Sequence, residues 1–284
     1  MSSIIKFNIL SRFTSAVQVT AEIECEEDAS YGIKLGLAVR WAVKAGANLY
    51  GADLTRANLY GADLTRANLY GANLTRANLY GANLYGADLT RANLYGADLT
   101  RANLYGADLT RANLYGADLT RANLYGADLT RANLYGANLT RANLYGANLY
   151  GADLTRANLY GANLTRANLY GAKNLELAIA QTRILPEGTL IGWKKLRHNV
   201  IAKLEIPAEA KRSHAFGRKC RAEWVTCLEI IGAKNGVGVS MHDGTTEYRA
   251  GETIKPDKFD LNWQEECASG IHFFITREEA EAYD

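Results

Sequence analysis

The sequence predicts a mainly β protein in which a long parallel β-solenoid lies between a small strand–helix segment and a carboxyl-terminal α+β domain. Leucine occupies every fifth position from Leu49 to Leu169, which makes 25 consecutive pentads. Alanine stands two residues before each leucine, and only Asn or Asp stands between the two. A period of five fits neither the period of about 3.6 of an α-helix nor the alternation of a flat strand.

The segment before the repeats predicts a cap. Residues 4–24 alternate apolar and polar side chains in strand fashion, and residues 29–45 are typical of an amphipathic helix. Ile33, Leu37 and Trp41 share one face of that helix. Because solenoid ends need covering, we expect residues 1–46 to cap the apolar end of the first coil.

The repeating unit is Ala, then Asn or Asp, then Leu, followed by either Tyr-Gly or Thr-Arg. Its short period indicates a chain that turns a corner every five residues. Leu and Ala lie two residues apart, so on an extended side they face the same way and fill the interior. Each buried leucine contributes about 1.5–3 kcal/mol before conformational entropy is counted. The other positions face outward or form the corner.

This repeat, over residues 47–171, resembles the pentapeptide-repeat family, and every repeat in the segment matches. The resemblance implies a right-handed quadrilateral parallel β-helix solenoid with twenty residues per coil. The near-identity of the repeats indicates either recent tandem duplication or consensus design.

A coil of twenty residues would stack tyrosines above one another. The alternation of Tyr-Gly and Thr-Arg pentads slips at Tyr80–Tyr85 and again at Tyr145–Tyr150. Arg91, Arg111 and Arg131 should run beside Asp88, Asp108 and Asp128 and offset the repulsion among these carboxylates. The candidate binding surface comprises two tyrosine ladders and one arginine row: Tyr85, Tyr105, Tyr125, Tyr145; Tyr95, Tyr115, Tyr135; Arg91, Arg111, Arg131. The alternative is a self-neutralising solvated face.

Beyond the repeats, an extra residue at Lys173 breaks the register, so we expect an exit cap or linker at 172–185 and an α+β domain at 186–284. Residues 200–206, 224–231 and 270–275 predict strands, Gly236–Gly238 and Asp243-Gly244 predict turns, and Thr276 predicts the N-cap of a short final helix.

The carboxyl-terminal segment resembles the carboxyl-terminal domain of bacteriophage-encoded pentapeptide-repeat proteins, which have no assigned activity. The matching stretches are Ile191–Lys195, Arg218–Glu223, Ser240–Asp243 and Glu266–Thr276. The resemblance implies origin and architecture, and it implies no chemistry.

Cysteine and histidine offer the only candidates for catalysis. Cys267 with His272, or Cys227 with His242, could form a thiol nucleophile and its base if close in space. No flanking nucleophile motif accompanies them, and the spacings do not match those of zinc sites. We therefore expect structural roles, reduced thiols, no catalytic residue, no cofactor and no metal.

Charge bears on the choice of partner. The chain has 32 Lys and Arg against 30 Asp and Glu, for a net charge of +2. The repeats hold eleven Arg and eight Asp, whereas a mimic of duplex DNA, of the kind that protects DNA gyrase in some pentapeptide-repeat proteins, must be strongly acidic. Residues 194–221 hold nine Lys or Arg against two Glu. This basic stretch either pairs with the acidic half of its own domain or contacts phosphates.

The sequence thus predicts a non-enzymatic scaffold, phage-related, whose rod displays tyrosine and Asp/Arg ladders and terminal domains to a protein partner. We expect no membrane contact, and nucleic-acid contact only through 194–221. Homo-oligomerisation through the ladders or the terminal domains stays open. The opening residues predict no signal peptide, which indicates the cytoplasm, or the virion if phage-encoded. The alternatives are an inhibitor or protector of a nucleic-acid enzyme such as DNA gyrase, and an enzyme in the carboxyl-terminal domain.

Overall fold

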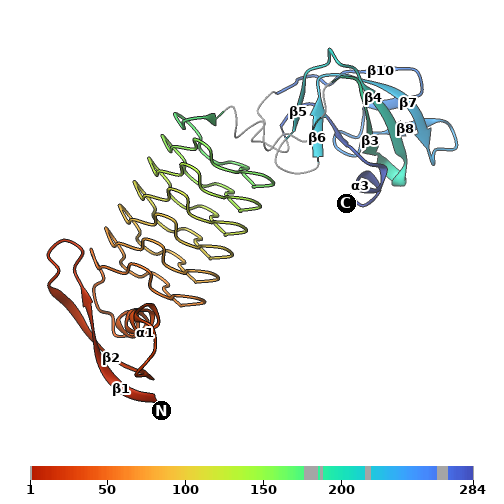
Figure 1. Ribbon diagram of the computed structural model, residues 1–284. Coiled ribbons are helices and arrows are strands. Elements are labelled where there is room, and N and C mark those ends of the chain that lie inside the picture. Colours follow the sequence, from red (N-terminus) through yellow and green to blue (C-terminus); the bar gives the residue numbers. More distant parts are fainter. Residues whose placement is uncertain (1, 176–184, 186–187, 215–218, 261–267, 284) are drawn as a thin grey trace. The chain divides into compact units, whose positions relative to one another are not determined.

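The structure is a computed structural model that describes residues 2–175, 185, 188–214, 219–260 and 268–283. It divides into two compact units, Met1–Thr182 and Arg183–Asp284. Figure 1 shows a strand pair, a helix and a stack of coils in the first unit, and a sheet in the second.

The first unit opens with a β-hairpin and a helix. Strand β1 (Ser2–Leu10) pairs antiparallel with β2 (Val17–Glu26), and helix α1 (Tyr31–Lys44) follows. The Ser30 side chain accepts a hydrogen bond from the backbone N–H of Ile33 and so caps the helix. The strand and helix patterns of the sequence are confirmed here.

The buried face of α1 differs from the predicted one. Ile33 is 42% exposed and Trp41 is 37% exposed. The reason is close approach to the first coil: a Cβ atom added at Gly36 would lie only 1.9 Å from the backbone oxygen of Asn58. Gly32 and Gly36 therefore lie against the coil, while Ile33 and Trp41 are left partly exposed. The buried residues are Leu35, Gly36, Ala38, Val39 and Ala42.

Backbone hydrogen bonds join this segment to the first coil. The N–H of Asn58 donates to the carbonyl of Gly32 in α1 at 2.8 Å, and the N–H of Asp53 donates to the carbonyl of Leu10 at 2.7 Å. Arg12 adds a side-chain bond from Nη1 to the carbonyl of Gly71 at 2.8 Å. These bonds give partners to backbone groups of Asp53, Asn58 and Gly71 at this end of the solenoid.

The repeats form a β-helix whose coil is twenty residues long. Parallel β-bridges join residues twenty apart, from Asp53–Asn73 to Asp153–Lys173, so each coil holds four pentads. Leucines at every fifth position from Leu49 to Leu169 are between 0 and 4% exposed. The predicted leucine–alanine interior is confirmed, and Figure 1 shows the coils stacked on one another.

Each corner is a hydrogen-bonded turn with a left-handed residue. In one example the N–H of Ala97 donates to the carbonyl of Leu94 at 3.0 Å, and Gly96 between them has φ of 60°. In the alternate pentads arginine takes this position, with φ between 55° and 60°. The Asn or Asp before the leucine holds the turn, as when Oδ1 of Asn93 accepts the N–H of Tyr95 at 3.2 Å.

The second unit is built on a seven-stranded sheet whose neighbouring strands all run antiparallel. The strand order is β10-β7-β4-β3-β11-β6-β5. A separate pair joins β8 to β9. The elements are β3 (Leu190–Lys195), η1 (Arg197–Asn199), β4 (Ile201–Ile206), β5 (Arg212–His214), β6 (Lys219–Ala222), β7 (Val225–Ile231), β8 (Val237–Val239), β9 (Glu247–Arg249), β10 (Thr253–Ile254), β11 (Ile271–Phe274) and α3 (Arg277–Glu281).

Three predicted strands are confirmed as β4, β7 and β11, and the turn at Asp243-Gly244 is present. Val237 and Gly238 instead belong to β8, so the predicted turn ends at Gly236. Thr276 caps α3 in a reciprocal capping box with Glu279, as the sequence indicates. The predicted exit cap at 172–185 lies mostly outside the described residues.

The left-handed corner yields a test of what fixes the coil. Gly116 has φ of 62°, and an added Cβ would meet nothing within 4 Å, so a side chain there costs backbone strain alone. We expect Gly116→Val to lower the free energy of unfolding by about 1–3 kcal/mol, and Gly116→Asn by less, because Asn tolerates this conformation. Chemical unfolding followed by circular dichroism measures both.

Thr100→Val is the matched control, because it places valine at a corner position where φ is not positive. Equal stability of the Val and Asn variants at position 116 would contradict the claim that the positive φ of this corner residue limits which side chains it accepts.

Candidate functional site

Two continuous stacks of tyrosine lie on the surface of the β-helix. Successive rings in them are 5.0–5.3 Å apart between centroids and within 14° of parallel. Tyr85, Tyr95, Tyr105 and Tyr115 are each 40% exposed. The predicted ladders therefore exist as stacked stripes with accessible edges: Tyr85, Tyr105, Tyr125, Tyr145 and Tyr95, Tyr115, Tyr135.

Both stripes end under an arginine. After the second slip the next rung on these sides is a Thr-Arg pentad. The guanidinium carbon of Arg156 lies 5.7 Å from the ring centroid of Tyr135, and that of Arg166 lies 5.7 Å from the ring centroid of Tyr145. These cation–π contacts cover the last ring of each ladder.

The same slips produce a hollow on a third side of the coil. Along it Tyr70 is followed by three Thr-Arg rungs and then by Tyr150, so small threonines replace tyrosine rings for three coils. The hollow has a volume of about 330 Å³. Its lining brings together all three arginines of the predicted row: Tyr70, Thr90, Arg91, Thr110, Arg111, Thr130, Arg131 and Tyr150.

The arginine row lies near the aspartate row in the sequence, but the described residues form no ion pair between the two rows, and the predicted offset of the carboxylate repulsion stays a prediction. Asp88, Asp108 and Asp128 stack as predicted. Each accepts the backbone N–H of the threonine two residues on, at 2.8–2.9 Å. Neither row makes an ion pair with the other within the part of the chain that the structure describes. The turn amides satisfy the carboxylates, and the arginines, one residue beyond those threonines, line the hollow as an exposed cationic row.

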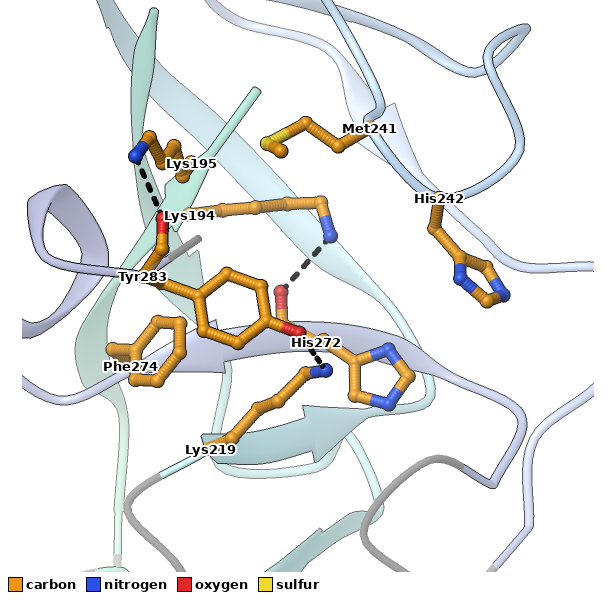
Figure 2. A pocket seen from close by; sticks show the side chains of 8 residues that line it. All are labelled: Lys194, Lys195, Lys219, Met241, His242, His272, Phe274 and Tyr283. Atoms are coloured by element: carbon orange, nitrogen blue, oxygen red, sulfur yellow. Dashed lines mark hydrogen bonds between the residues drawn. The ribbon is translucent and has the colours of Figure 1, made fainter. Parts of the chain in front are cut away.

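A second candidate site lies in the sheet of the second unit (Figure 2). This pocket of about 280 Å³ draws side chains from three neighbouring strands, β3, β11 and β6, and from the segments after β8 and α3. It is lined by Lys194, Lys195, Lys219, Met241, His242, His272, Phe274 and Tyr283.

Lys194 is the unusual member of this pocket. It is 9% exposed, and its Nζ donates to the carbonyl of His272 at 3.2 Å and lies 5.8 Å from the ring centroid of Tyr248. Burial and, after it, the nearby Lys219 lower the pKa of Lys194 to about 8, while Asp243 acts in the opposite direction. Among the described residues no carboxylate forms an ion pair with Lys194.

Asp243 is committed to its own turn. Its carboxylate accepts hydrogen bonds from the hydroxyl of Thr246 at 2.6 Å and from the backbone N–H of Thr245 at 2.9 Å. Burial opposes ionisation of Asp243, but these hydrogen bonds together outweigh it and hold the pKa of the carboxyl well below its usual range.

The sequence did not single out this pocket, although the basic stretch 194–221 contained a signal. Lys194 and Lys195 stand at one end of that stretch and Lys219 near the other, and the sheet brings them together. Pairing within the domain accounts for other members: Lys211 lies 3.5 Å from the carboxylate of Glu223, and the buried Arg221 donates to Ser213. Contacts within the domain therefore account for Lys211 and Arg221, and phosphate contact by the stretch stays a prediction.

Of the two thiols in the predicted thiol–histidine pairs, Cys227 and Cys267, the structure describes Cys227. Cys227 is fully buried, and that burial raises the pKa of its thiol, which opposes a nucleophilic role. Cys267 lies outside the described residues. His242 and His272 instead line the same side of the pocket, with ring centroids 6.1 Å apart. In the described part of the chain no group of three or more His, Cys, Asp or Glu could hold a metal, and no helix could cross a membrane.

Comparisons with known proteins match two parts of the chain. A family model of pentapeptide repeats matches residues 45–79, 67–104, 77–115, 107–146 and 142–173. A family of unknown function, DUF5758, matches residues 180–280. A search of curated proteins found no match.

Solved structures resemble the repeat segment. HetL of the cyanobacterium Nostoc sp. strain PCC 7120, a pentapeptide repeat protein involved in heterocyst differentiation regulation, is 42% identical over 44% of this chain and 65% of its own, with a TM-score of 0.29. The chain thus spans just under two thirds of HetL. A pentapeptide repeat protein of the Arabidopsis thaliana thylakoid lumen is 33% identical over 44% and 74%, with a TM-score of 0.27. QnrB1, a plasmid-mediated fluoroquinolone resistance protein, is 21% identical over 47% and 89%, with a TM-score of 0.25.

The buried ammonium of Lys194 predicts an unusual pH dependence of stability. Below pH 8 the folded state holds the buried ammonium of Lys194 without a carboxylate partner among the described residues. Between about pH 8 and 10.5 Lys194 is deprotonated in the folded state but still protonated in the unfolded state. The free energy of unfolding therefore rises with pH across this window. We expect Lys194→Met to raise the free energy of unfolding at pH 7 by about 1–3 kcal/mol. Its advantage over the wild type should fade across that window.

Denaturant unfolding at a series of pH values measures this difference. Lys234→Met, at an exposed position, should follow the wild-type pH dependence. A Lys194→Met variant that is less stable than the wild type at pH 7 would show that the cation has a structural partner.

Proposed function

Because the chain belongs to the pentapeptide-repeat family, we propose that its β-helix is a non-enzymatic scaffold that presents aromatic and cationic stripes to a protein partner. The observation that carries the proposal is that stacked, part-exposed tyrosines share one hydrogen-bonded frame with an arginine row that forms no ion pair among the described residues. Tyrosine and arginine are the residues that protein interfaces enrich.

The frame supports this use because the stripes are ordered before binding. Each corner is fixed by backbone hydrogen bonds to the next coil, and each tyrosine packs on its neighbours in the ladder. A tyrosine has only two side-chain torsions, so little conformational entropy remains to be lost on binding. Solenoids generally offer extended surfaces of this kind.

The finer architecture belongs to the same proposal. The twenty-residue coil supports a quadrilateral cross-section. We propose that the chain winds in the right-handed sense. We keep the divisions at 1–46, 47–171, 172–185 and 186–284, and the relation to bacteriophage proteins, as predictions. Self-association through the ladders remains open to measurement.

A ladder variant tests the docking surface. We expect the triple change Tyr95→Ser, Tyr115→Ser and Tyr135→Ser to remove capture of a partner by the immobilised full chain from extract of the native host. The fold should persist, because each ring is part-exposed and its stacking contributes about 0.5–1.5 kcal/mol per pair. Quantitative mass spectrometry of the captured proteins provides the measurement.

The control is the pair Tyr60→Ser and Tyr80→Ser, which removes a shorter stack near the first coil. A specific partner should be retained by this control and by the wild type. The proposal fails if all three chains capture the same proteins, or if none of them captures a specific protein.

The charge of the β-helix argues against the alternative function, protection of DNA gyrase by imitation of duplex DNA. Eleven arginines against eight aspartates give a surplus of three positive charges over 47–171, where a DNA mimic requires a dense negative field. We expect the purified chain at micromolar concentration to leave gyrase supercoiling unchanged in a gel assay. Dose-dependent inhibition or protection would establish the alternative.

A further inference from the structure

The pocket beside β3, β11 and β6 gathers cations without a matching anion. Lys194 and Lys219 both line it, and neither forms an ion pair with a carboxylate of the described residues. Lys219 donates to the hydroxyl of Tyr283 at 2.8 Å and lies 4.7 Å from its ring centroid. The sheet thus holds two ammonium groups against one small cavity, as Figure 2 shows.

The surrounding polar groups do not neutralise these cations. Lys195 is turned toward the end of the chain, where its Nζ donates to the carbonyls of Glu281 and Tyr283. Among the described residues, the carboxylate that acts on Lys194 belongs to Asp243, which is bonded to its own turn. An ammonium that is nine-tenths buried beside a second one is costly, and an anion in the cavity would offset that cost.

The pocket also contains hydrogen-bond donors and an apolar wall. Apart from its bond to the carbonyl of His272, Lys194 has ammonium hydrogens left to donate. His242 and His272 stand on one side with their rings 6.1 Å apart, and Phe274 and Met241 supply apolar surface. The volume of about 280 Å³ lies just below the range of roughly 300–1,000 Å³ that is typical of pockets for drug-sized ligands, so the ligand must be small.

We propose that this pocket binds a small organic phosphate monoester, with Lys194 and Lys219 holding the phosphate and Phe274 and Met241 contacting its organic part. A phosphate monoester carries nearly two negative charges at pH 7 and three acceptor oxygens, which matches two ammonium groups and adjacent imidazoles. A carboxylate offers one charge and a planar pair of oxygens, which suits an arginine fork better. The site is independent of the docking surface on the β-helix.

Isothermal titration calorimetry of the full chain at pH 7 tests the site with four probes: inorganic phosphate, phenyl phosphate, benzoate and a short single-stranded oligonucleotide. We expect phenyl phosphate to bind more tightly than inorganic phosphate, because its ring meets the apolar wall, and benzoate to bind weakly. Lys194→Met and Lys219→Gln should each lower the affinity for phenyl phosphate roughly tenfold or more, the effect of losing one hydrogen bond to a charged group. Lys234→Gln is the matched control at an exposed lysine.

The variants also separate binding from folding. In phosphate-free buffer Lys194→Met should melt no lower than the wild type, while phenyl phosphate should raise the melting temperature of the wild type and of Lys234→Gln only. The absence of any binding by phenyl phosphate at millimolar concentration, or binding that both pocket variants retain, overturns the proposal. Lysine-dependent binding of the oligonucleotide in preference to phenyl phosphate overturns it in favour of a nucleic-acid contact.

Discussion

One constraint governs the repeat unit: every fifth side chain must enter a shared apolar column, so the chain must turn sharply between successive leucines. The turn needs a residue with positive φ, which Gly and Arg supply in alternate pentads, and a side-chain acceptor before the leucine, which Asn or Asp supplies. With those requirements met, each pentad ends in either Tyr-Gly or Thr-Arg. The surface pattern of the β-helix is therefore set by the order of two pentad types, independently of its interior.

The two phase slips turn that order into a surface with distinct regions. A shift of one pentad exchanges tyrosine and Thr-Arg rungs on every side of the coil at once. On the sides of Tyr85 and Tyr95 the exchange begins a ladder, and on the side of Tyr70 it begins the hollow of Arg91, Arg111 and Arg131. Without the slips each side would carry a single unbroken stripe. A partner could then bind at any coil along the stripe. With the slips, each ladder and the hollow begin and end at defined coils.

Much of the surface pattern of the β-helix could be predicted from the sequence, because it follows from the coil length and the order of the pentads. Once the coil length is known, the stacking of Tyr105 on Tyr125 or of Asp88 on Asp108 is a matter of counting. Two local details could not be predicted by counting residues. The face that α1 buries depends on how closely Gly36 approaches Asn58, and the aspartates accept their own turn amides without an ion pair to the arginine row among the described residues. Both outcomes are set by distances of a few ångströms, which periodicity does not encode.

The pocket of the second unit could not be predicted from the sequence, for a different reason. Lys194, Lys219 and His272 lie on strands that are neighbours in the sheet but distant in the chain, and the strand order β3-β11-β6 that joins them is not written in any local pattern. The contrast between the units is physical. In the β-helix, exposed arginines remain hydrated, so an unpaired row costs little. In the sheet, Lys194 is buried beside another cation, so leaving it unpaired is expensive. An unpaired cation is thus weak evidence for a ligand on the coil and much stronger evidence in the pocket.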